Sequence, residues 1–283
     1  MNKIGFNLLA WSSSISDELF SISERLKEIG YDGIECFLGS EENKIYKHFG
    51  RHIHDLELDI TCVLVLGAEE DPISDSSVVR NKGLDRIKWA IDRASDMDSK
   101  IICGPFHSAY AHFSNKAPEN EEYIRSAEIL LKAGEYAEQA GVVLALEAVN
   151  RFECYLCNTM DQLLKLIKLV SHPNVKALYD THHSNIEDKN IKDAIHTISP
   201  VLSHVHISEN DRGTPGKGHI LWDETFSALA EVGYEGWFTI EAFTLNDPDF
   251  ANLINVWREY SAPWEIAEQG FKFIQRMSDK YGF

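Results

Sequence analysis

The chain has 283 residues, of which 44% are hydrophobic and 25% are charged, a composition that is typical of a folded globular protein and excludes a disordered or fibrous one. Its 27 Lys and Arg residues against 45 Asp and Glu residues give a formal net charge of −18, which argues against binding the phosphate backbone of a nucleic acid and favours a neutral or cationic small partner. Because no apolar run approaches the roughly 18 residues of a membrane span, we expect no membrane segment.

Short apolar segments alternate with longer segments of helical spacing along the chain. In chain order, the apolar segments predict strands over residues 4–9, 33–37, 60–66, 101–104, 142–148, 177–179, 203–207 and 237–242. The amphipathic segments predict helices over residues 14–29, 85–95, 122–140, 160–170, 193–198, 224–232 and 265–277. Gly30, Gly141 and Gly233 follow three of these helices, where glycine suits a left-handed C-cap.

This alternation predicts a parallel sheet covered by helices, because strands that are buried on both faces are apolar nearly throughout. Eight strands in units of roughly 35 residues, each followed by a helix, fit a closed (β/α)8 TIM barrel. We therefore expect the α/β class and a single barrel domain over residues 1–283. The rival fold is an open, doubly wound sheet, but no Gly-x-Gly-x-x-Gly motif follows an early strand.

Polar residues end the last four predicted strands, one residue to a strand: Glu147, Asp180, His206 and Glu241. The carboxyl ends of TIM barrel strands meet at one mouth, where three carboxylates would repel one another unless a cation lay between them. Three oxygens and one imidazole nitrogen suit Mn²⁺, Co²⁺ or Mg²⁺. The alternative is four separate polar residues, each with its own partners, but their place on four consecutive strands favours a metal site.

The residues that follow these strand ends are also polar, and such a cluster suits the hydroxyls of a sugar. Together the segments Leu-Glu-Ala-Val-Asn-Arg-Phe-Glu (146–153), Tyr-Asp-Thr-His-His-Ser-Asn-Ile-Glu (179–187), His-Ile-Ser-Glu-Asn-Asp-Arg-Gly-Thr-Pro-Gly-Lys-Gly-His (206–219) and Ile-Glu-Ala-Phe (240–243) resemble the ketose 3-epimerases. This is the D-tagatose and D-psicose 3-epimerase group within the xylose-isomerase-like TIM barrel superfamily. The likeness runs along the whole chain and is densest from residue 140 to residue 245.

The resemblance implies a role for each matching residue. It implies one Mn²⁺ or Co²⁺ ion per chain, held by Glu147, Asp180, His206 and Glu241, with Glu147 and Glu241 also acting as the two acid/base carboxylates. It implies that Glu153, His183 and Arg212 hold the O1 and O2 end of the substrate. The candidates for the pocket at the far end of the sugar are Asn7, Trp11, Leu66, Phe106 and His107.

The implied reaction is epimerisation of a free ketose at C3, by deprotonation to a cis-enediolate and reprotonation on the other face. D-Tagatose, D-psicose, D-fructose and L-ribulose are all candidate substrates. The segment 252–283 carries Trp257 and Trp264 and ends in an amphipathic helix. Exposed aromatics of this kind are typical of an oligomer interface, so we expect a homodimer or homotetramer, although this helix could instead pack across its own barrel.

Other functions of the same barrel superfamily remain alternatives. A hydroxypyruvate isomerase or an inosose-type isomerase or dehydratase would share the four metal ligands. A trinuclear-zinc apurinic endonuclease would need further ligands, for which His107, His183 and His219 are available, but the charge of −18 opposes DNA binding. A sugar sensor without catalysis would have no need of two carboxylates at a metal.

The remaining metal-like and redox-like patterns have simpler interpretations. Cys154-x-x-Cys157 lacks a partner pair, and His48 and His52 fit a solvated helix face. An odd number of cysteines, 5 in all, and an N-terminus without a secretory pattern predict free thiols and a cytoplasmic protein.

Overall fold

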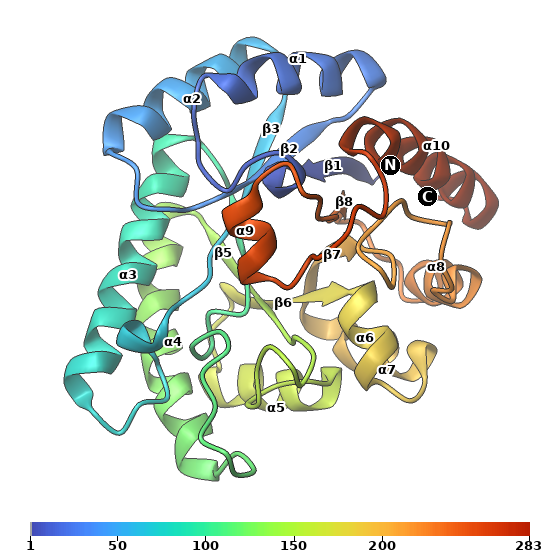
Figure 1. Cartoon of the computed structure of the whole chain (residues 1–283). Coiled ribbons are helices and arrows are strands. Elements are labelled where there is room, and N and C mark those ends of the chain that lie inside the picture. The colour runs from blue at the N-terminus through green and yellow to red at the C-terminus, as the bar shows by residue number, and fades with distance from the viewer. Residues whose placement is uncertain (1) are drawn as a thin grey trace.

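The computed structural model describes residues 2–283, and their strands form one closed parallel barrel in the order β1 to β8 (Figure 1). The strands are β1 (Lys3–Asn7), β2 (Gly33–Phe37), β3 (Asp59–Val63), β4 (Ile101–Gly104), β5 (Val143–Glu147), β6 (Val175–Asp180), β7 (Leu202–Ile207) and β8 (Trp237–Ile240). β1 pairs with both β2 and β8, which closes the barrel. The predicted (β/α)8 fold is confirmed.

Several strands end earlier than their apolar residues predict. β1 ends at Asn7 because the Asn7 side chain accepts a hydrogen bond from the backbone N of Leu9 and starts a 3-10 helix over Leu8–Ala10. The predicted strands 60–66 and 237–242 likewise stop at Val63 and Ile240. Apolar residues continue past these ends because the chain is still buried at the mouth, so burial alone does not mark where pairing stops.

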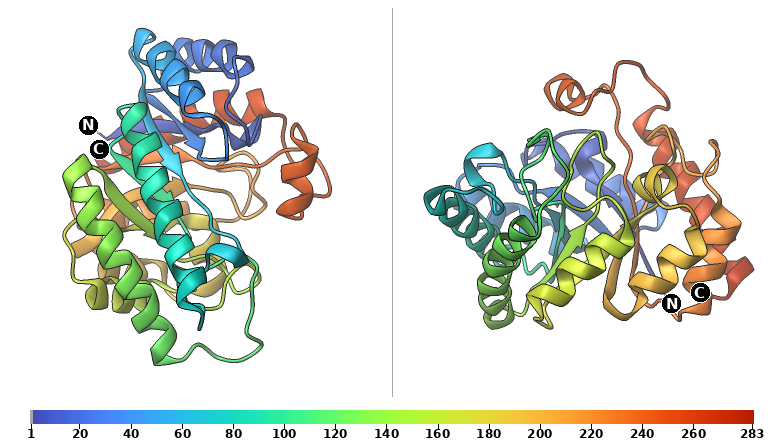
Figure 2. Two further views of the ribbon diagram at one scale, coloured as in Figure 1. Left: turned by 90° about the vertical axis from the view of Figure 1, so that its left-hand side faces the viewer. Right: turned by 90° about the horizontal axis from the view of Figure 1, so that it is seen from below.

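The helices α1 (Glu18–Ile29), α2 (Asn43–Asp55), α3 (Ser77–Asp96), α4 (Asn120–Ala140), α5 (Met160–Val170), α7 (Ile191–Ile198), α8 (Trp222–Glu231) and α10 (Pro263–Tyr281) surround the barrel (Figures 1 and 2). The prediction for α3 was eight residues short at its start, since polar residues fill its first turns. α2 and the two short helices α6 (Thr181–Glu187) and α9 (Pro248–Leu253) were not among the predicted helix ranges. Gly141 caps α4 with φ 66°, as predicted, and Gly233 follows α8 with φ 67°.

The two ends of the barrel differ. Both termini lie at one end, whereas α9 stands over the opposite end, beyond the carboxyl ends of the strands (Figure 2). α10 packs across its own barrel, with Trp264 4.8 Å from Trp11 between ring centroids and the Arg25 guanidinium 4.0 Å above the Trp264 ring. Trp257, by contrast, is 66% exposed.

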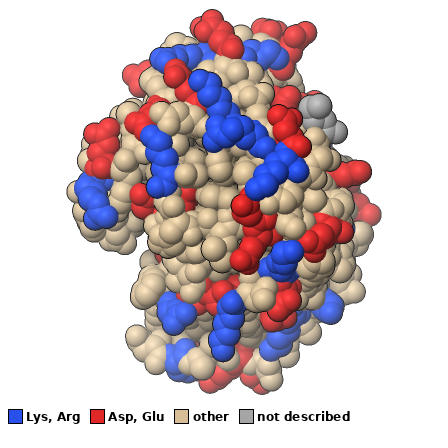
Figure 3. Space-filling view, turned by 90° about the vertical axis from the view of Figure 1, so that its right-hand side faces the viewer, with Lys and Arg blue, Asp and Glu red and all other residues tan. Residues whose placement is uncertain are grey.

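The outer surface carries mixed charge. On the face that carries α8 and α10, Lys and Arg side chains lie among Asp and Glu side chains (Figure 3), and Lys280–Asp223 and Arg25–Glu268 form ion pairs there. Within residues 2–283, the structure has no helix that combines the length and the apolar character needed to cross a membrane.

Candidate metal centre and active site

Four side chains from four consecutive strands converge at the mouth of the barrel. Glu147 and Asp180 are the last residues of β5 and β6, His206 lies in β7, and Glu241 follows β8 directly. All four are buried, and one ligand atom from each lies within 4.8 Å of the others. We call these four residues the mouth cluster. Parallel strands in register bring them together, as expected from their positions at the strand ends.

The spacing in the mouth cluster suits one ion. His206 Nδ1 lies 3.5 Å from Glu241 Oε1, 3.7 Å from Asp180 Oδ2 and 4.0 Å from Glu147 Oε1. These separations are expected for donor atoms that each lie about 2.1 Å from the same cation. Within the described part of the chain, His206 Nδ1 and Glu147 Oε1 are buried atoms without a hydrogen-bond partner. Buried polar atoms are normally satisfied, so this pair fits a cation bound between them.

A hydrogen bond to Glu35, on the side away from the mouth cluster, orients the His206 ring. Its Nε2 lies 2.8 Å from Glu35 Oε1, and because a carboxylate only accepts, the ring proton is on Nε2. Nδ1, which faces the three carboxylates, is then the ring nitrogen available to ligate a cation. A histidine that ligates a metal is usually held in this way by a carboxylate on its other nitrogen.

The charges of the site also favour a divalent cation. Burial, and then the charge of Glu241, raises the pKa of Glu147 well above its usual range. Arg212 Nη1 lies 2.8 Å from Glu241 Oε2 and 3.2 Å from Asp180 Oδ2, so one positive charge is already present. Three carboxylates and one guanidinium leave two negative charges, which a divalent ion balances. The donor set and the charge therefore both fit a divalent metal.

Arg212 holds an unusual backbone conformation. Its φ is +62°, which costs a non-glycine residue about 1 kcal/mol. Two backbone hydrogen bonds fix it, from Arg212 N to the Glu209 carbonyl at 3.0 Å and from Phe243 N to the Arg212 carbonyl at 3.0 Å. The loop after β7 thus aims the guanidinium into the mouth.

Glu153, His183 and Arg212 are brought together beside the mouth cluster. His183 Nδ1 accepts from the Asn150 backbone N at 3.1 Å, while His183 Nε2 lies 2.9 Å from Arg212 Nη2 and 3.6 Å from Glu147 Oε1. Glu153 Oε1 accepts from Asn150 Nδ2 at 2.7 Å. The Asn-Arg-Phe-Glu motif therefore places polar groups next to Glu147, and the substrate role of these three residues stays a prediction.

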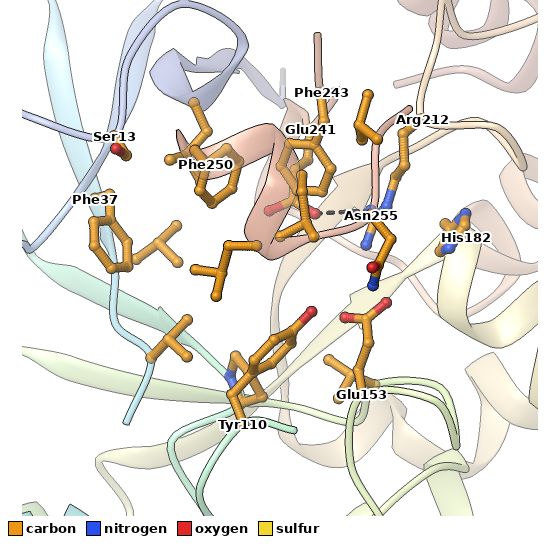
Figure 4. A pocket seen from close by; sticks show the side chains of 18 of the residues that line it. Ser13, Phe37, Tyr110, Glu153, His182, Arg212, Glu241, Phe243, Phe250 and Asn255 are labelled. Carbon is orange, nitrogen blue, oxygen red and sulfur yellow. Dashed lines mark hydrogen bonds and ion pairs between the residues drawn. The ribbon is translucent and has the colours of Figure 1, made fainter. Parts of the chain in front are cut away.

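A cavity of about 660 Å³ opens above these groups, within the range of small-molecule sites (Figure 4). Its wall includes Glu147, Glu153, His183, Arg212, Glu241 and Leu66 among the predicted site residues. Figure 4 shows Glu241 between a side that carries Phe37 and Phe250 and a side that carries Arg212, His182 and Asn255. The cavity thus joins the mouth cluster to two walls of different chemistry.

Four predicted pocket residues are not among those that line this cavity. Asn7 lies beneath the mouth, where its Nδ2 donates to Glu35 Oε1 at 3.0 Å and to Glu241 Oε1 at 3.3 Å. His107 is buried, with Nε2 3.0 Å from the Glu147 carbonyl oxygen. Phe106 and Trp11 pack in the hydrophobic core. Asn7 ends β1, and the other three residues lie in the segments after β1 and β4, so a position at or after a strand end does not by itself place a side chain in the cavity wall.

Glu35 was missed by the sequence analysis. It lies in the middle of β2 with 0% exposure, and it accepts hydrogen bonds from Thr61, Asn7, Cys103 and His206. Burial would raise the pKa of Glu35, but the charges of His206 and then His204 hold it well below its usual range. A carboxylate inside an otherwise apolar strand is the signal for such a residue, but Glu35 does not lie at a strand end, where the other site residues are found.

Other missed residues lie in the loops. Tyr110 and Asn255 line the cavity, and Asn255 points toward Glu153 in Figure 4. Glu209 is fully buried and accepts from Gly216 N at 2.8 Å and Trp222 Nε1 at 3.1 Å. Glu209 therefore shapes the loop that presents Arg212.

Glu153, His182 and His183 also place ligand atoms close together. Arg212 opposes a cation at this second group. Its charge, after burial, lowers the pKa of His182 to about 4 and that of His183 well below its usual range. This group therefore fits the oxygens of a sugar better than it fits an ion.

Comparison with known proteins agrees with the fold. The sequence profile of the xylose isomerase-like TIM barrel family matches residues 23–277. The L-ribulose 3-epimerase of Mesorhizobium japonicum is 30% identical over 261 residues, which cover 91% of this chain and 88% of the relative. The chain belongs to the ketose 3-epimerase family of xylose isomerase-like TIM barrels.

One further relative and one solved structure match this chain over nearly its whole length. The D-psicose 3-epimerase of Agrobacterium fabrum is 27% identical over 270 residues, which cover 94% of this chain and 93% of the relative. A solved structure of L-ribulose 3-epimerase superposes with a TM-score of 0.94 at 28% identity and covers 99% of this chain and 96% of its own. The chain is therefore an enzyme of the isomerase class.

Proposed function

We propose that this enzyme epimerises free ketoses at C3, with Glu147 and Glu241 as its two acid/base groups. One observation carries the proposal. Two buried carboxylates from different strands face the same cavity around His206 Nδ1, with Glu241 Oε1 at 3.5 Å and Glu147 Oε1 at 4.0 Å. Inversion at a carbon needs one proton acceptor and one proton donor on opposite faces, and we propose this pair for the two roles.

The mouth cluster would hold one divalent metal ion through Glu147, Asp180, His206 and Glu241. Mn²⁺ and Co²⁺ suit its three carboxylates and single imidazole best, and Mg²⁺ is also compatible. When bound, such an ion supplies Lewis acidity toward the oxygens next to the reacting carbon.

The side chains would divide the proton transfers. One glutamate takes the C3 proton, and the electron pair that it leaves is delocalised onto the C2 carbonyl as a cis-enediolate. The other glutamate, protonated, returns a proton to the opposite face of C3. Burial and the charge of Glu241 raise the pKa of Glu147, which is the direction expected of a carboxyl group that has to carry a proton in one step. The direction of the reaction decides which glutamate begins as the base.

Arg212 and His183 would hold O1 and O2 of the substrate. Both line the cavity on the side of Glu153, and the guanidinium can stabilise the negative charge that develops on O2. Glu153 would accept a hydrogen bond from a substrate hydroxyl, while the hydrogen bond from Asn150 Nδ2 holds the Glu153 carboxylate in position. Because related enzymes are named D-psicose and L-ribulose 3-epimerases, we propose substrates of the D-tagatose, D-psicose, D-fructose and L-ribulose type.

The test is incubation of the metal-loaded enzyme with a panel of these free ketoses in heavy water, followed by NMR. Epimerisation with deuterium at C3 is the expected result. Product without deuterium would indicate a hydride shift, as in sugar isomerases, and loss of water from the substrate would indicate a dehydratase. Either outcome contradicts the two-glutamate scheme.

The proposal extends to assembly and location. We propose a homodimer or homotetramer in the cytoplasm, which is supported by the exposed Trp257 and Leu253 and by five buried free cysteines. Sedimentation velocity of the metal-loaded enzyme at micromolar concentration tests the assembly. A monomer alone would contradict it.

A further inference from the structure

The cavity is apolar on the side away from Arg212. We define the apolar wall as Leu9, Phe37, Val63, Val65, Leu66 and Phe250, all of which line the cavity. The first five come from the carboxyl ends of β1, β2 and β3 or the residues just after them, and Phe250 comes from α9. The acid/base and polar groups come instead from β5 to β8 and their loops.

The apolar wall is a packed surface. Phe37 contacts both the hydrophobic cluster of Leu9 and the cluster of Val63, so it joins the two parts of the wall. Phe250 packs edge-on against Phe243 with ring centroids 5.3 Å apart. Figure 4 shows Phe37 and Phe250 on one side of Glu241, opposite Arg212 and His182. The catalytic carboxylate therefore lies at the border between two chemically different walls.

One hydrogen-bonding group next to the apolar wall, Ser13, is already engaged. Ser13 lies beside Phe37 and Phe250 in Figure 4, and its hydroxyl donates to Asp247 Oδ2 at 2.7 Å. Of the described residues that line the cavity, Arg212 is the one Lys or Arg, and it is paired with Asp180 and Glu241. A terminal phosphate would thus meet no free cation here and would face a chain of net charge −18.

This inference rests on the proposed function, which fixes how the sugar lies. With O1 and O2 at Arg212 and His183 and with C3 between Glu147 and Glu241, the rest of the carbon chain extends across the cavity. Its terminal carbon then reaches the apolar wall. A methyl group gains free energy when it is buried there, whereas a hydroxyl group without a partner loses free energy.

We propose that the preferred substrates are unphosphorylated 6-deoxyketohexoses, whose terminal carbon is a methyl group. The apolar wall binds this methyl, and the polar wall binds the O1 and O2 end. A hexulose with a terminal hydroxymethyl group is also turned over, but less efficiently.

The experiment compares matched pairs that differ only at O6: D-psicose with 6-deoxy-D-psicose, and L-tagatose with 6-deoxy-L-tagatose. Each is incubated with the metal-loaded enzyme in heavy water, and deuterium at C3 gives the rate. We expect kcat/KM to be about tenfold higher or more for the 6-deoxy member of at least one pair, mainly through KM. Equal or lower values for both 6-deoxy sugars overturn the inference and leave the proposed function intact. Absence of exchange from all four sugars overturns the proposed function itself.

A matched pair of variants tests the wall directly. Val65→Thr keeps the side-chain shape and replaces one methyl group with a hydroxyl at a half-buried position, so the fold is retained. It should lower the ratio of kcat/KM for the 6-deoxy sugar to that for its parent by about threefold or more. Val78→Thr makes the same change on α3, where the side chain is 65% exposed and outside the cavity, and it should leave the ratio unchanged. A ratio that is unchanged in Val65→Thr, or that falls equally in both variants, contradicts the role of the wall.

Discussion

Two buried groups of potential metal ligands share His206 and differ in the spacing of their donor atoms. The mouth cluster faces His206 Nδ1, and a second group of Glu35, Cys103 and His204 faces its Nε2. We call Glu35, Cys103, His204 and His206 the core cluster. In the mouth cluster the atoms around Nδ1 are 3.5 to 4.0 Å away, whereas Glu35 Oε1 approaches Nε2 to 2.8 Å.

The core cluster has no room for an ion between its members. His204 Nε2 lies 2.9 Å from Glu35 Oε2, and Cys103 Sγ lies 3.2 Å from the same oxygen. At these distances Glu35 itself occupies the centre that a cation would take. Similar residue types therefore form two kinds of cluster, and the spacing of the donor atoms distinguishes them. The mouth cluster has the spacing of an ion site, whereas in the core cluster Glu35 contacts the other members directly.

Removing the metal should have the largest effect. Dialysis against a strong chelator should abolish turnover, because the charge of three carboxylates at the mouth then lacks its counterion. Addition of Mn²⁺ or Co²⁺ should restore activity and raise Tm by several degrees, since a ligand at 100 times its Kd stabilises the fold by about 2.7 kcal/mol. Differential scanning fluorimetry and metal analysis provide the measurements. If the chelator leaves turnover unchanged, the reaction takes place outside the mouth cluster.

Replacing either acid/base glutamate should have the second largest effect. Glu147→Gln and Glu241→Gln should each lower kcat by about 10³-fold, because an amide of similar shape cannot accept or deliver a proton at C3. Both are assayed at saturating metal, and the metal content of each variant is measured so that loss of the ion is not mistaken for loss of the base. Near wild-type kcat in either metal-loaded variant would refute the two-base scheme.

Glu35→Gln should have an intermediate effect that reaches the mouth through His206. The amide cannot act as acceptor for all four of its donors, so the His206 ring loses its fixed orientation. We expect the Kd for the metal to rise about 10- to 100-fold, while kcat at saturating metal changes much less. Glu122→Gln is the control, because Glu122 is also buried but lies on α4, away from both clusters. Equal losses of metal affinity in both variants would mean that Glu35 acts through general stability alone.

The mouth cluster was predictable from the sequence, but Glu35, which supports it through His206, was not. Glu147, Asp180 and Glu241 each interrupt an apolar strand at its end, so strand positions and barrel geometry suffice to bring them together. Glu35 lies inside its strand, and its importance depends on contacts with Cys103 and His206, which are distant in sequence.

The cavity walls were the least predictable part. Phe106 and His107 follow β4, just as Leu66 follows β3, but only Leu66 faces the opening. The direction of a side chain after a strand depends on the loop conformation, which no periodic pattern encodes. α9 is six residues long and was not predicted, since its position over the mouth comes from packing against Leu9 and Phe243 rather than from helical periodicity.

The smallest expected effect is that of Cys103→Ser, which distinguishes a support from a second ion site. Serine can still donate to Glu35 Oε2, so the orientation of His206 and the metal Kd should change by less than about threefold, at a stability cost of about 1 kcal/mol. Metal analysis should give one ion per chain in both the wild type and the variant. If the core cluster bound its own ion through the Cys103 thiolate, the wild type would hold two ions and Cys103→Ser would hold one. That outcome would reverse the assignment drawn from the spacing, because it would require Glu35 to move away from His204 and His206 when the second ion binds.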